Sequence, residues 1–459
     1  MFKRILIANR GEIALRIIRA CKELGIETVV VFSKEDEESL PVRFADEAIC
    51  IGPRDPAESY LNVPRIISAA EVAGVDAIHP GYGFLAENEQ FAEICRSSGV
   101  EFIGPPHEVI KKLGDKVEAR NTLAEAGIPV IPGSDGVVKD KKEARKVISQ
   151  IGYPVILKAA LGGGGRGMRV VREEKELDSL FDLAQQEAKS SFGKPDLYIE
   201  KYFNRARHIE FQILADKFGK VLHLGERDCS IQRRHQKLME ESPSLILDDS
   251  LRRQMGKAAV KVAEELGYVG VGTVEFLVDE EKRFYFMEVN TRLQVEHPVT
   301  EMVTGRDLVK DQILIAAGER LSYDQEDIRI EGSAIECRIN AEDPEKNFAP
   351  SPGKITALHL PGGPGVRVDT HIFSGYFVPS AYDSLLAKLI TWGRDRREAM
   401  GRMKRALEEF VIEGIKTTIP FHQHIIEDER FQKGRFYTSF VEEELMMGKG
   451  GKVEGGKGL

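Results

Sequence analysis

The sequence predicts an α/β region followed by α+β regions in a chain of 459 residues. Three observations support this class. Short apolar runs alternate with helical patterns at the start, paired β-branched runs follow, and 42% of the residues are hydrophobic while 30% are charged. At about 100–200 residues per domain, this length suggests about three domains. We expect regions at 1–113, 114–331 and 332–446, and a disordered Gly- and Lys-rich tail at 447–459.

The first region alternates predicted strands and helices. Its strands are the apolar runs at 3–8, 28–32, 77–78 and 102–103. A helix is predicted over 12–24, where apolar residues recur on one face and Gly25 follows. This alternation predicts a parallel sheet covered by helices. The first turn lacks G-x-G-x-x-G, so a dinucleotide site there has little support.

The second and third regions contain hairpins mixed with helices. Strand pairs are predicted at 154–159 with 168–172, and at 273–278 with 283–289. In the third region, a strand is predicted around 334–339. A helix near 395–410 places Ala399, Met403, Leu407 and Phe410 on one face. Antiparallel pairs mixed with helices indicate α+β character.

Composition excludes several classes of protein. The net charge of −9 and pI of about 5.8 argue against a nucleic-acid surface. No apolar run reaches the ~20 residues of a membrane span, and the start does not resemble a secretory signal, so we expect a cytoplasmic protein. The five cysteines form no C-x-x-C pair, which argues against a disulfide framework or a structural zinc site. Cys229 could be a nucleophile, but no neighbouring feature supports that role.

A glycine-rich loop separates the two strands of the first hairpin. Its backbone N–H groups, for example at Gly163, Gly164 and Gly165, could approach phosphate oxygens closely because no Cβ intervenes. Arg166 and Lys158 would add positive charge. The segment could instead be an ordinary loose hairpin loop. The density of glycines favours a flap over phosphates.

Polar residues alternate after the second strand of the other hairpin. The series is Glu288, Asn290, Arg292, Gln294 and Glu296, which would share one face for as long as the chain stays extended. One interpretation is a strand with a solvated outer face. However, Glu275 could lie opposite Glu288, and like charges that face each other are unfavourable without a cation between them. Together with the Asn290 oxygen they suit Mg²⁺ beside nucleotide phosphates, with Arg292 and Glu296 placed to hold and deprotonate a small oxyanion.

Six segments in order resemble the biotin carboxylase family, within the ATP-grasp superfamily. They are ANRGEIA at 8–14, HPGYGFLAEN at 79–88, KAALGGGGRGM at 158–168, GERDCSIQRRHQK at 225–237, EVNTRLQVEHPVTE at 288–301 and ECRINAEDP at 336–344. The resemblance implies an ATP-grasp fold with an N-terminal Rossmann-like parallel-sheet domain and a C-terminal biotin carboxylase domain. It also implies a mobile glycine-rich lid at about 131–203.

The resemblance also implies roles for residues at matching positions. Those implied to bind ATP are Lys116, Lys158, Gly163, Gly164, Gly165, Arg166, Glu200, Lys201, His208, Gln232, His235, Glu275, Leu277 and Glu288. Glu275, Glu288 and Asn290 would hold Mg²⁺ or Mn²⁺, and Lys237, Arg292, Gln294 and Val295 would hold bicarbonate. Glu296 would be the base, Arg338 would steady the biotin enolate, and Tyr82 would lie near biotin. The catalytic set is therefore Glu296, Arg292, Arg338 and Lys237.

The expected activity is ATP- and bicarbonate-dependent carboxylation of biotin on a separate carrier protein. The expected partners are that carrier, carboxyltransferase subunits and a second copy of this chain, with Arg16, Arg19 and Glu23 facing the copy. Acetyl-CoA carboxylase is the first choice of holoenzyme, and pyruvate carboxylase or another acyl-CoA or 2-oxoacid carboxylase is the alternative.

Other interpretations remain open. They are a carboxylate–amine ligase of the same fold and a non-catalytic nucleotide sensor. At individual positions, His208 and His235 could be structural histidines. Tyr82 could simply be packed in a loop, and Arg338 could be a surface ion-pair partner.

Overall fold

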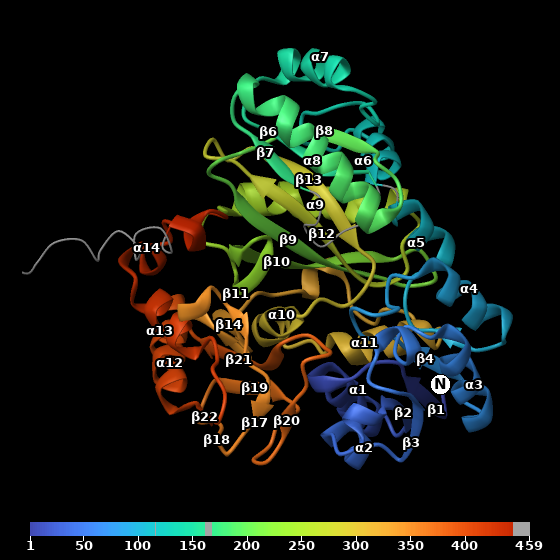
Figure 1. The fold of residues 1–459 in the computed structure, drawn as a ribbon. Helices are drawn as coiled ribbons and strands as arrows, with labels where there is room; N and C mark the ends of the chain where they lie inside the picture. The colour runs from blue at the N-terminus through green and yellow to red at the C-terminus, as the bar shows by residue number, and fades with distance from the viewer. Residues whose placement is uncertain (115, 161–167, 444–459) are drawn as a thin grey trace, which may run out of the picture.

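The computed structural model describes residues 1–114, 116–160 and 168–443, with the side chains of Lys116 and Phe192 left out. Figure 1 shows a lobe that carries α7, a broad central sheet, and two lower units formed by the beginning and end of the chain. None of the helices in the described ranges combines the length and apolar character that a membrane crossing requires.

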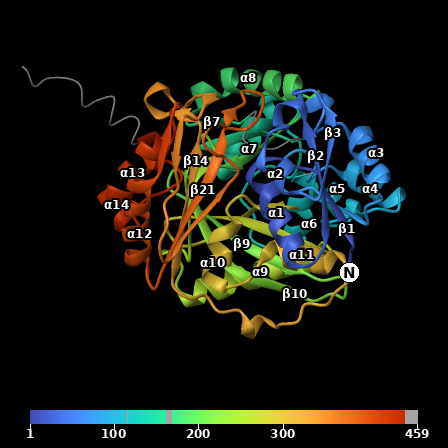
Figure 2. The same ribbon diagram turned by 90° about the horizontal axis from the view of Figure 1, so that it is seen from below.

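The N-terminal unit is a parallel sheet flanked by helices, as predicted. Its strand order is β3-β2-β1-β4-β5, and every neighbouring pair is parallel. Figure 2 shows the helices around this sheet. The strands are β1 (Arg4–Ile7), β2 (Glu27–Ser33), β3 (Glu47–Gly52), β4 (Ala77–His79) and β5 (Glu101–Phe102). The helices are α1 (Gly11–Glu23), α2 (Leu40–Phe44), α3 (Val63–Ala73), α4 (Glu89–Ser97) and α5 (His107–Gly114).

The upper lobe is built on a three-stranded antiparallel sheet, in the order β7-β6-β8. It contains β6 (Val155–Ala159), β7 (Arg169–Val171), β8 (Leu197–Lys201), α7 (Lys141–Ile151) and α8 (Glu174–Phe192). The predicted hairpin is confirmed, because β6 and β7 pair antiparallel on either side of the glycine-rich segment. The helix α6 (Lys116–Glu125) precedes this lobe.

An eight-stranded sheet joins the central and C-terminal regions, in the order β13-β12-β9-β10-β11-β14-β21-β19. Its strands are β9 (Arg207–Ala215), β10 (Val221–Arg233), β11 (Gln236–Ser242), β12 (Gly270–Val278), β13 (Phe284–Asn290), β14 (Ser333–Asn340), β19 (Val366–Thr370) and β21 (Leu385–Gly393). The predicted hairpin of β12 and β13 is confirmed, with Glu275 opposite Glu288. The pairing of β11 with β14 carries the sheet across the expected boundary near residue 331.

Helices and small sheets complete the central and C-terminal parts. The helices are α9 (Asp249–Glu265), α10 (His297–Thr304), α11 (Leu308–Ala316), α12 (Arg396–Glu409), α13 (Ile419–Glu427) and α14 (Glu429–Gln432). The two-stranded sheets pair β15 (Glu342–Asp343) with β16 (Ala349–Pro350), β17 (Gly353–Lys354) with β20 (Phe377–Val378), and β18 (Ala357–His359) with β22 (Val411–Glu413). The predicted helix near 395–410 is α12, in which Ala399, Met403 and Leu407 are buried, and Phe410 directly after its end is buried as well.

Aspartates begin several helices. The side chains of Asp140, Asp248 and Asp395 accept hydrogen bonds from backbone N–H groups in the first turns of α7, α9 and α12. The first N–H groups of a helix have no partner within it, so each aspartate satisfies donors that would otherwise be unpaired.

One apolar core belongs to both the N-terminal and central units. It packs Ile5 and Ile17 of the first unit against Leu214, Val271 and Ile313 of the central region. This shared core fixes the N-terminal unit against the central sheet, on which the candidate site lies.

Candidate active site

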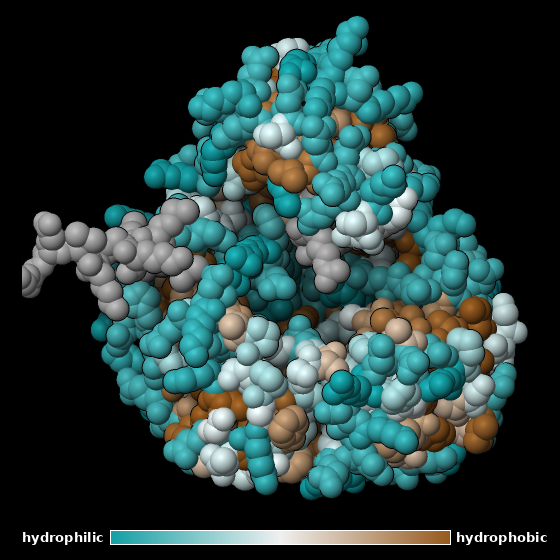
Figure 3. All heavy atoms as spheres, in the orientation of Figure 1, coloured by the Kyte–Doolittle hydropathy of each residue, from teal (hydrophilic) through white to brown (hydrophobic). Residues whose placement is uncertain are grey.

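The candidate site lies on the eight-stranded sheet, below the upper lobe. The face seen in Figure 3 is hollowed between that lobe and the rest of the molecule, and hydrophilic residues surround the hollow. Its polar side chains come from several strands, chiefly β9, β11, β12, β13 and β14, and from the segment after β13. The sheet therefore brings together residues that lie far apart in the sequence.

Lys237 on β11 is surrounded by three carboxylates. Its Nζ atom lies 2.5 Å from Glu210 Oε2, 2.9 Å from Glu275 Oε1 and 2.7 Å from Glu296 Oε1. Burial disfavours the ammonium charge, but the three carboxylates outweigh it and hold the pKa of Lys237 well above its ordinary value. Lys237 is therefore charged and gathers three acidic residues around one cation.

Glu296 is fully buried and ionised. Burial alone would raise its pKa, but Lys237 and Arg338 outweigh burial and lower the pKa below the ordinary value. Arg338 on β14 places its NH2 atom 2.8 Å from Glu296 Oε2 and 2.6 Å from Glu240 Oε1. The Arg338 side chain is 16% exposed, and both of its carboxylate partners are fully buried, so this ion pair lies inside the site and not on the surface.

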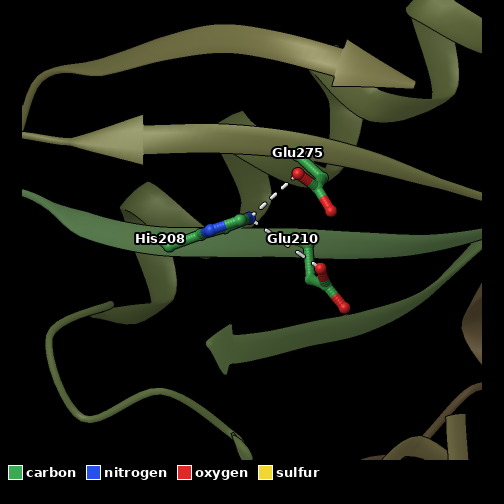
Figure 4. A group of neighbouring side chains, drawn as sticks. All are labelled: His208, Glu210 and Glu275. Atoms are coloured by element: carbon green, nitrogen blue, oxygen red, sulfur yellow. Dashed lines mark ion pairs between the residues drawn. The ribbon is translucent and has the colours of Figure 1, made fainter. Parts of the chain in front are cut away.

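His208, Glu210 and Glu275 lie together on the neighbouring strands β9 and β12 (Figure 4). His208 Nε2 is 3.1 Å from Glu275 Oε2 and 4.0 Å from Glu210 Oε2. Burial opposes the charge on His208, but Glu275 reverses this effect and raises the pKa of the imidazole. His208 belongs to the polar cluster and does not pack within an apolar core.

The predicted metal ligands are brought together. Glu275 and Glu288 are direct partners across β12 and β13, and Asn290 Nδ2 donates to Glu275 Oε1 at 2.9 Å. The ligand atoms of His208, Glu210 and Glu275 lie within 4.8 Å of one another. Carboxylate and amide oxygens suit a hard divalent cation such as Mg²⁺. The residues present therefore fit the predicted ion.

The polar series after β13 departs from the expected strand. β13 ends at Asn290, so Arg292, Gln294 and Glu296 do not continue the ladder. They converge through side chains instead. Arg292 NH2 donates to Asn290 Oδ1 at 3.0 Å and NH1 donates to Gln294 Oε1 at 2.9 Å, while Gln294 Nε2 donates to Glu275 Oε1 at 3.3 Å.

The remaining predicted nucleotide residues are divided between the lobe and the sheet. In the lobe, Lys158 Nζ lies 2.5 Å from Glu200 Oε2, and Lys201 Nζ donates to the Tyr153 carbonyl at 2.8 Å. On the sheet, Leu277 is the strand partner of His208, Gln232 is buried, and His235 lies in the exposed turn between β10 and β11. Gly163, Gly164, Gly165, Arg166 and the side chain of Lys116 lie outside the described residues.

Tyr82 lies in the loop after β4. Its hydroxyl donates to Glu12 Oε1, and its carbonyl accepts from Asn9 Nδ2 at 2.7 Å. Cys229 is fully buried, and burial raises the pKa of its thiol well above the ordinary value. Such a thiol is a poor nucleophile at neutral pH, which argues against that role for Cys229.

Besides Glu240, which pairs with Arg338, three residues of the site were missed from the sequence. Arg227 is 0% exposed and places its Nε atom 2.5 Å from Glu210 Oε1, behind Lys237. Glu87 accepts from Arg292 Nε at 2.9 Å. The third, Glu210, could have been found from the sequence. His208, Glu210 and Gln212 are polar residues at alternate positions, as in the series that begins at Glu288.

Family models match almost the whole chain. The biotin carboxylase N-terminal domain matches residues 1–110, the carbamoyl-phosphate synthase L chain ATP-binding domain matches 115–324, and the biotin carboxylase C-terminal domain matches 336–443.

Known relatives cover the chain at high identity. "Biotin carboxylase 1" of Bacillus subtilis (strain 168) is 59% identical over 98% of this chain and 100% of its own length. The "2-oxoglutarate carboxylase small subunit" of Hydrogenobacter thermophilus is 54% identical over 96% of this chain and 94% of its own length.

A solved structure matches the fold closely. It is the biotin carboxylase domain dimer of Hydrogenobacter thermophilus 2-oxoglutarate carboxylase, in complex with MgADP, ADP and bicarbonate. It superposes with a TM-score of 0.94 at 54% identity, covering 97% of this chain and 98% of that one. These matches confirm the predicted family and the predicted ATP-grasp architecture. The chain belongs to the biotin carboxylase family.

Proposed function

We propose that this chain uses ATP and bicarbonate to carboxylate N1 of biotin held on a carrier protein. One observation carries the proposal: Glu296 is buried and ionised between Lys237 and Arg338, and the same Lys237 ammonium also pairs with Glu275. A nucleotide sensor would need the phosphate and metal ligands. It would not need a buried base with an arginine on its far side.

Bicarbonate activation is assigned to Glu296. Arg292, Gln294, Val295 and Lys237 orient the anion, and Glu296 removes its proton as the anion attacks the γ-phosphoryl group of ATP. This step yields carboxyphosphate and ADP. Glu275, Glu288 and Asn290 would hold Mg²⁺ or Mn²⁺, which would supply positive charge to offset the phosphate charge.

Nucleotide binding is assigned to residues of both the lobe and the sheet. They are Lys116, Lys158, Gly163, Gly164, Gly165, Arg166, Glu200, Lys201, His208, Gln232, His235 and Leu277. Lys158 and Glu200 are held against each other on adjacent strands of the lobe, above the sheet that carries His208. We propose that the lobe closes over the nucleotide and excludes water from carboxyphosphate.

Biotin activation is assigned to Arg338 and Tyr82. Carboxyphosphate breaks into CO₂ and phosphate, and the phosphate takes the proton from biotin N1. Arg338 pairs with the enolate oxygen that forms, and N1 attacks CO₂ to give carboxybiotin. In this structure the guanidinium of Arg338 pairs with Glu240 and Glu296, so it is already charged and held at the edge of the base.

The test supplies the purified chain with ATP, labelled bicarbonate and free biotin. We expect labelled carboxybiotin and phosphate release that depends on bicarbonate. A carboxylate–amine ligase of the same fold would instead consume ATP with a carboxylate and an amine and ignore biotin. Failure to carboxylate biotin under conditions where ATP binds would overturn the proposal.

We propose a homodimer that works with a biotin carrier and carboxyltransferase subunits in the cytoplasm. The Hydrogenobacter thermophilus relative is a dimer. Here Arg19 and Glu23 are exposed, whereas Arg16 is buried against Glu301 and Asp307. Acetyl-CoA carboxylase is our first choice of holoenzyme, and pyruvate carboxylase or another acyl-CoA or 2-oxoacid carboxylase is the alternative. Isolation of the native complex, with identification of the co-purifying carboxyltransferase, decides between them.

A further inference from the structure

Lys388 on β21 is a lysine whose side chain is completely buried. Its Nζ atom donates to the carbonyl oxygen of Val295 at 2.9 Å and lies 3.1 Å from Glu12 Oε1. A buried ammonium is tolerated when it is paired and hydrogen-bonded, and Lys388 meets both conditions. Its two partners belong to segments almost 300 residues apart in the sequence, which are held at one point by a single cation.

The first partner is a backbone group of the bicarbonate site. Val295 lies between the end of β13 at Asn290 and the start of α10 at His297, where no sheet ladder or helix fixes its carbonyl. The peptide bond is planar, so holding the Val295 carbonyl fixes the plane that joins Val295 to Glu296. It also directs the N–H of Glu296 the opposite way. Lys388 therefore sets the backbone from which the base projects.

The second partner leads to the biotin site. Glu12 is 4% exposed in the first turn of α1, and the oxygen that faces Lys388 also accepts the hydroxyl of Tyr82. The Lys388 ammonium also lies 6.0 Å from the centre of the Tyr82 ring. The position of the Tyr82 side chain therefore depends on a carboxylate that Lys388 neutralises.

Buried carboxylates surround Lys388, so a cation is needed at this position to offset their charge. Asp369 Oδ2 lies 4.0 Å from Lys388 Nζ, so the lysine faces the buried carboxylates of Glu12 and Asp369, and its charge also acts on the buried Glu336. Asp369 is also paired with Arg367 at 2.7 Å. Among the described ion pairs, Glu12 has Lys388 as its cation.

We infer that Lys388 is a positioning residue that couples the bicarbonate site to the biotin site through the Val295 carbonyl and through Glu12 and Tyr82. The inference rests on the proposed function, because it assigns a consequence to residues of that site. Lys388 touches neither substrate in this scheme. It acts through the peptide that carries the base and through the carboxylate that holds the tyrosine.

The test replaces Lys388 by methionine, which is similar in length and lacks the charge. In bicarbonate-dependent ATP hydrolysis without biotin, we expect the KM for bicarbonate to rise about 10-fold, the scale of one charge-assisted hydrogen bond. The KM for ATP should stay within about twofold, because Lys388 contacts none of the proposed nucleotide residues. The KM for free biotin should also rise in the carboxylation assay.

A second variant separates positioning from folding. Lys388→Met leaves Glu12 buried without its cation and should lower Tm, whereas Lys388→Met combined with Glu12→Gln removes both charges and should recover most of that loss. If Lys388 only supports the fold, the bicarbonate KM will recover together with Tm. The inferred role requires the KM to stay raised. If the single variant does not fold, the bicarbonate KM of the double variant alone tests the inference.

Arg10→Met is the matched control. Arg10 is another buried cation between the N-terminal and C-terminal parts, paired with Asp36 at 2.7 Å and stacked on Tyr382. Its loss should lower Tm without moving the bicarbonate KM.

Two outcomes would overturn the inference about Lys388 and leave the proposed function intact. One is a Lys388→Met enzyme with an unchanged bicarbonate KM, and the other is an equal KM rise in Arg10→Met. A wild-type chain without bicarbonate-dependent hydrolysis would overturn the proposed function, and this inference with it.

Discussion

Both large sheets of this molecule bury apolar residues, but the eight-stranded sheet also buries charged side chains. In the parallel sheet, Leu6 of β1 and Val29 of β2 are 0% exposed and pack against other apolar residues. In the eight-stranded sheet, Glu210, Arg227 and Lys388 are also 0% exposed. Apolar burial stabilises the fold without a partner, whereas each buried charge must find an opposite charge nearby.

The two sheets therefore differ in role: the parallel sheet stabilises the fold, and the eight-stranded sheet carries the residues of the candidate active site. The parallel sheet contributes stability that does not depend on any substrate. The eight-stranded sheet holds its acids and bases in place through mutual ion pairs, such as Lys237 with three carboxylates. We therefore expect mutations in the first sheet to change stability and mutations in the second to change turnover.

The largest effect is expected for Glu296→Gln. It removes the proposed base and keeps the side-chain shape, so bicarbonate-dependent phosphate release should fall at least ~100-fold, while calorimetric ADP affinity should stay within a few-fold. Glu226→Gln is the control, because Glu226 is equally buried and pairs with Arg252 away from the site. Turnover that survives Glu296→Gln, or an equal loss in the control, would contradict the base assignment.

A core truncation in the parallel sheet should show the opposite pattern. Leu6→Ala leaves a cavity and should lower the free energy of unfolding by about 2–5 kcal/mol in urea denaturation. Turnover per folded molecule should be unchanged. Val72→Ala on α3, at a position that is 83% exposed, is the control and should leave both quantities unchanged. A Leu6→Ala enzyme with normal stability would show that this core tolerates such a loss.

The charged sheet should also give the protein a pH-dependent stability. Burial raises the pKa of Glu240 from 4.5 to about 7, although Arg338 opposes the shift. The folded carboxyl thus binds its proton more tightly than the unfolded one, and the free energy of unfolding should fall as pH rises from about 4.5 to about 7. Glu240→Gln removes this titration, so Tm measured across that range should decline less than in wild type. Parallel Tm profiles would contradict the assignment.

The smallest effect is expected at the surface. Lys404 and Glu427 form an ion pair at 2.7 Å, with both side chains more than half exposed. Lys404→Ala should leave Tm and turnover within experimental error, because solvent and salt screen such a pair. A clear loss of stability would show that surface charges also support this fold.

The elements with regular spacing were the ones that the sequence revealed. The alternation of apolar runs and helices predicted the parallel sheet, and the two hairpins were predicted from β-branched runs. The joining of β11 to β14 could not be predicted in the same way. That pairing depends on long-range register, which period-two patterns within a single strand do not encode.

Residue patterns alone predicted the candidate site where its residues lie close in the sequence, whereas the distant Lys237 and Arg338 were predicted from the family resemblance. Glu275, Glu288 and Asn290 belong to one hairpin, so their meeting followed from local structure. Arg227 and Glu87 entered from other segments, and their contacts depend on strand order and on the packing of the N-terminal unit against the central sheet. The residues after Asn290 left the strand, so their convergence on Glu275 arises from side-chain pairing and not from backbone alternation.

The core that packs Ile17 against Leu214 and Ile313 limits how the N-terminal unit can be separated from the central sheet or replaced by that of another protein. A fragment carrying only the parallel sheet would expose one side of that core to water. Insertions or fusion joints are therefore best tolerated in exposed connections such as the Gly219 turn between β9 and β10, and a swap of the N-terminal part between homologues must preserve this interdomain packing.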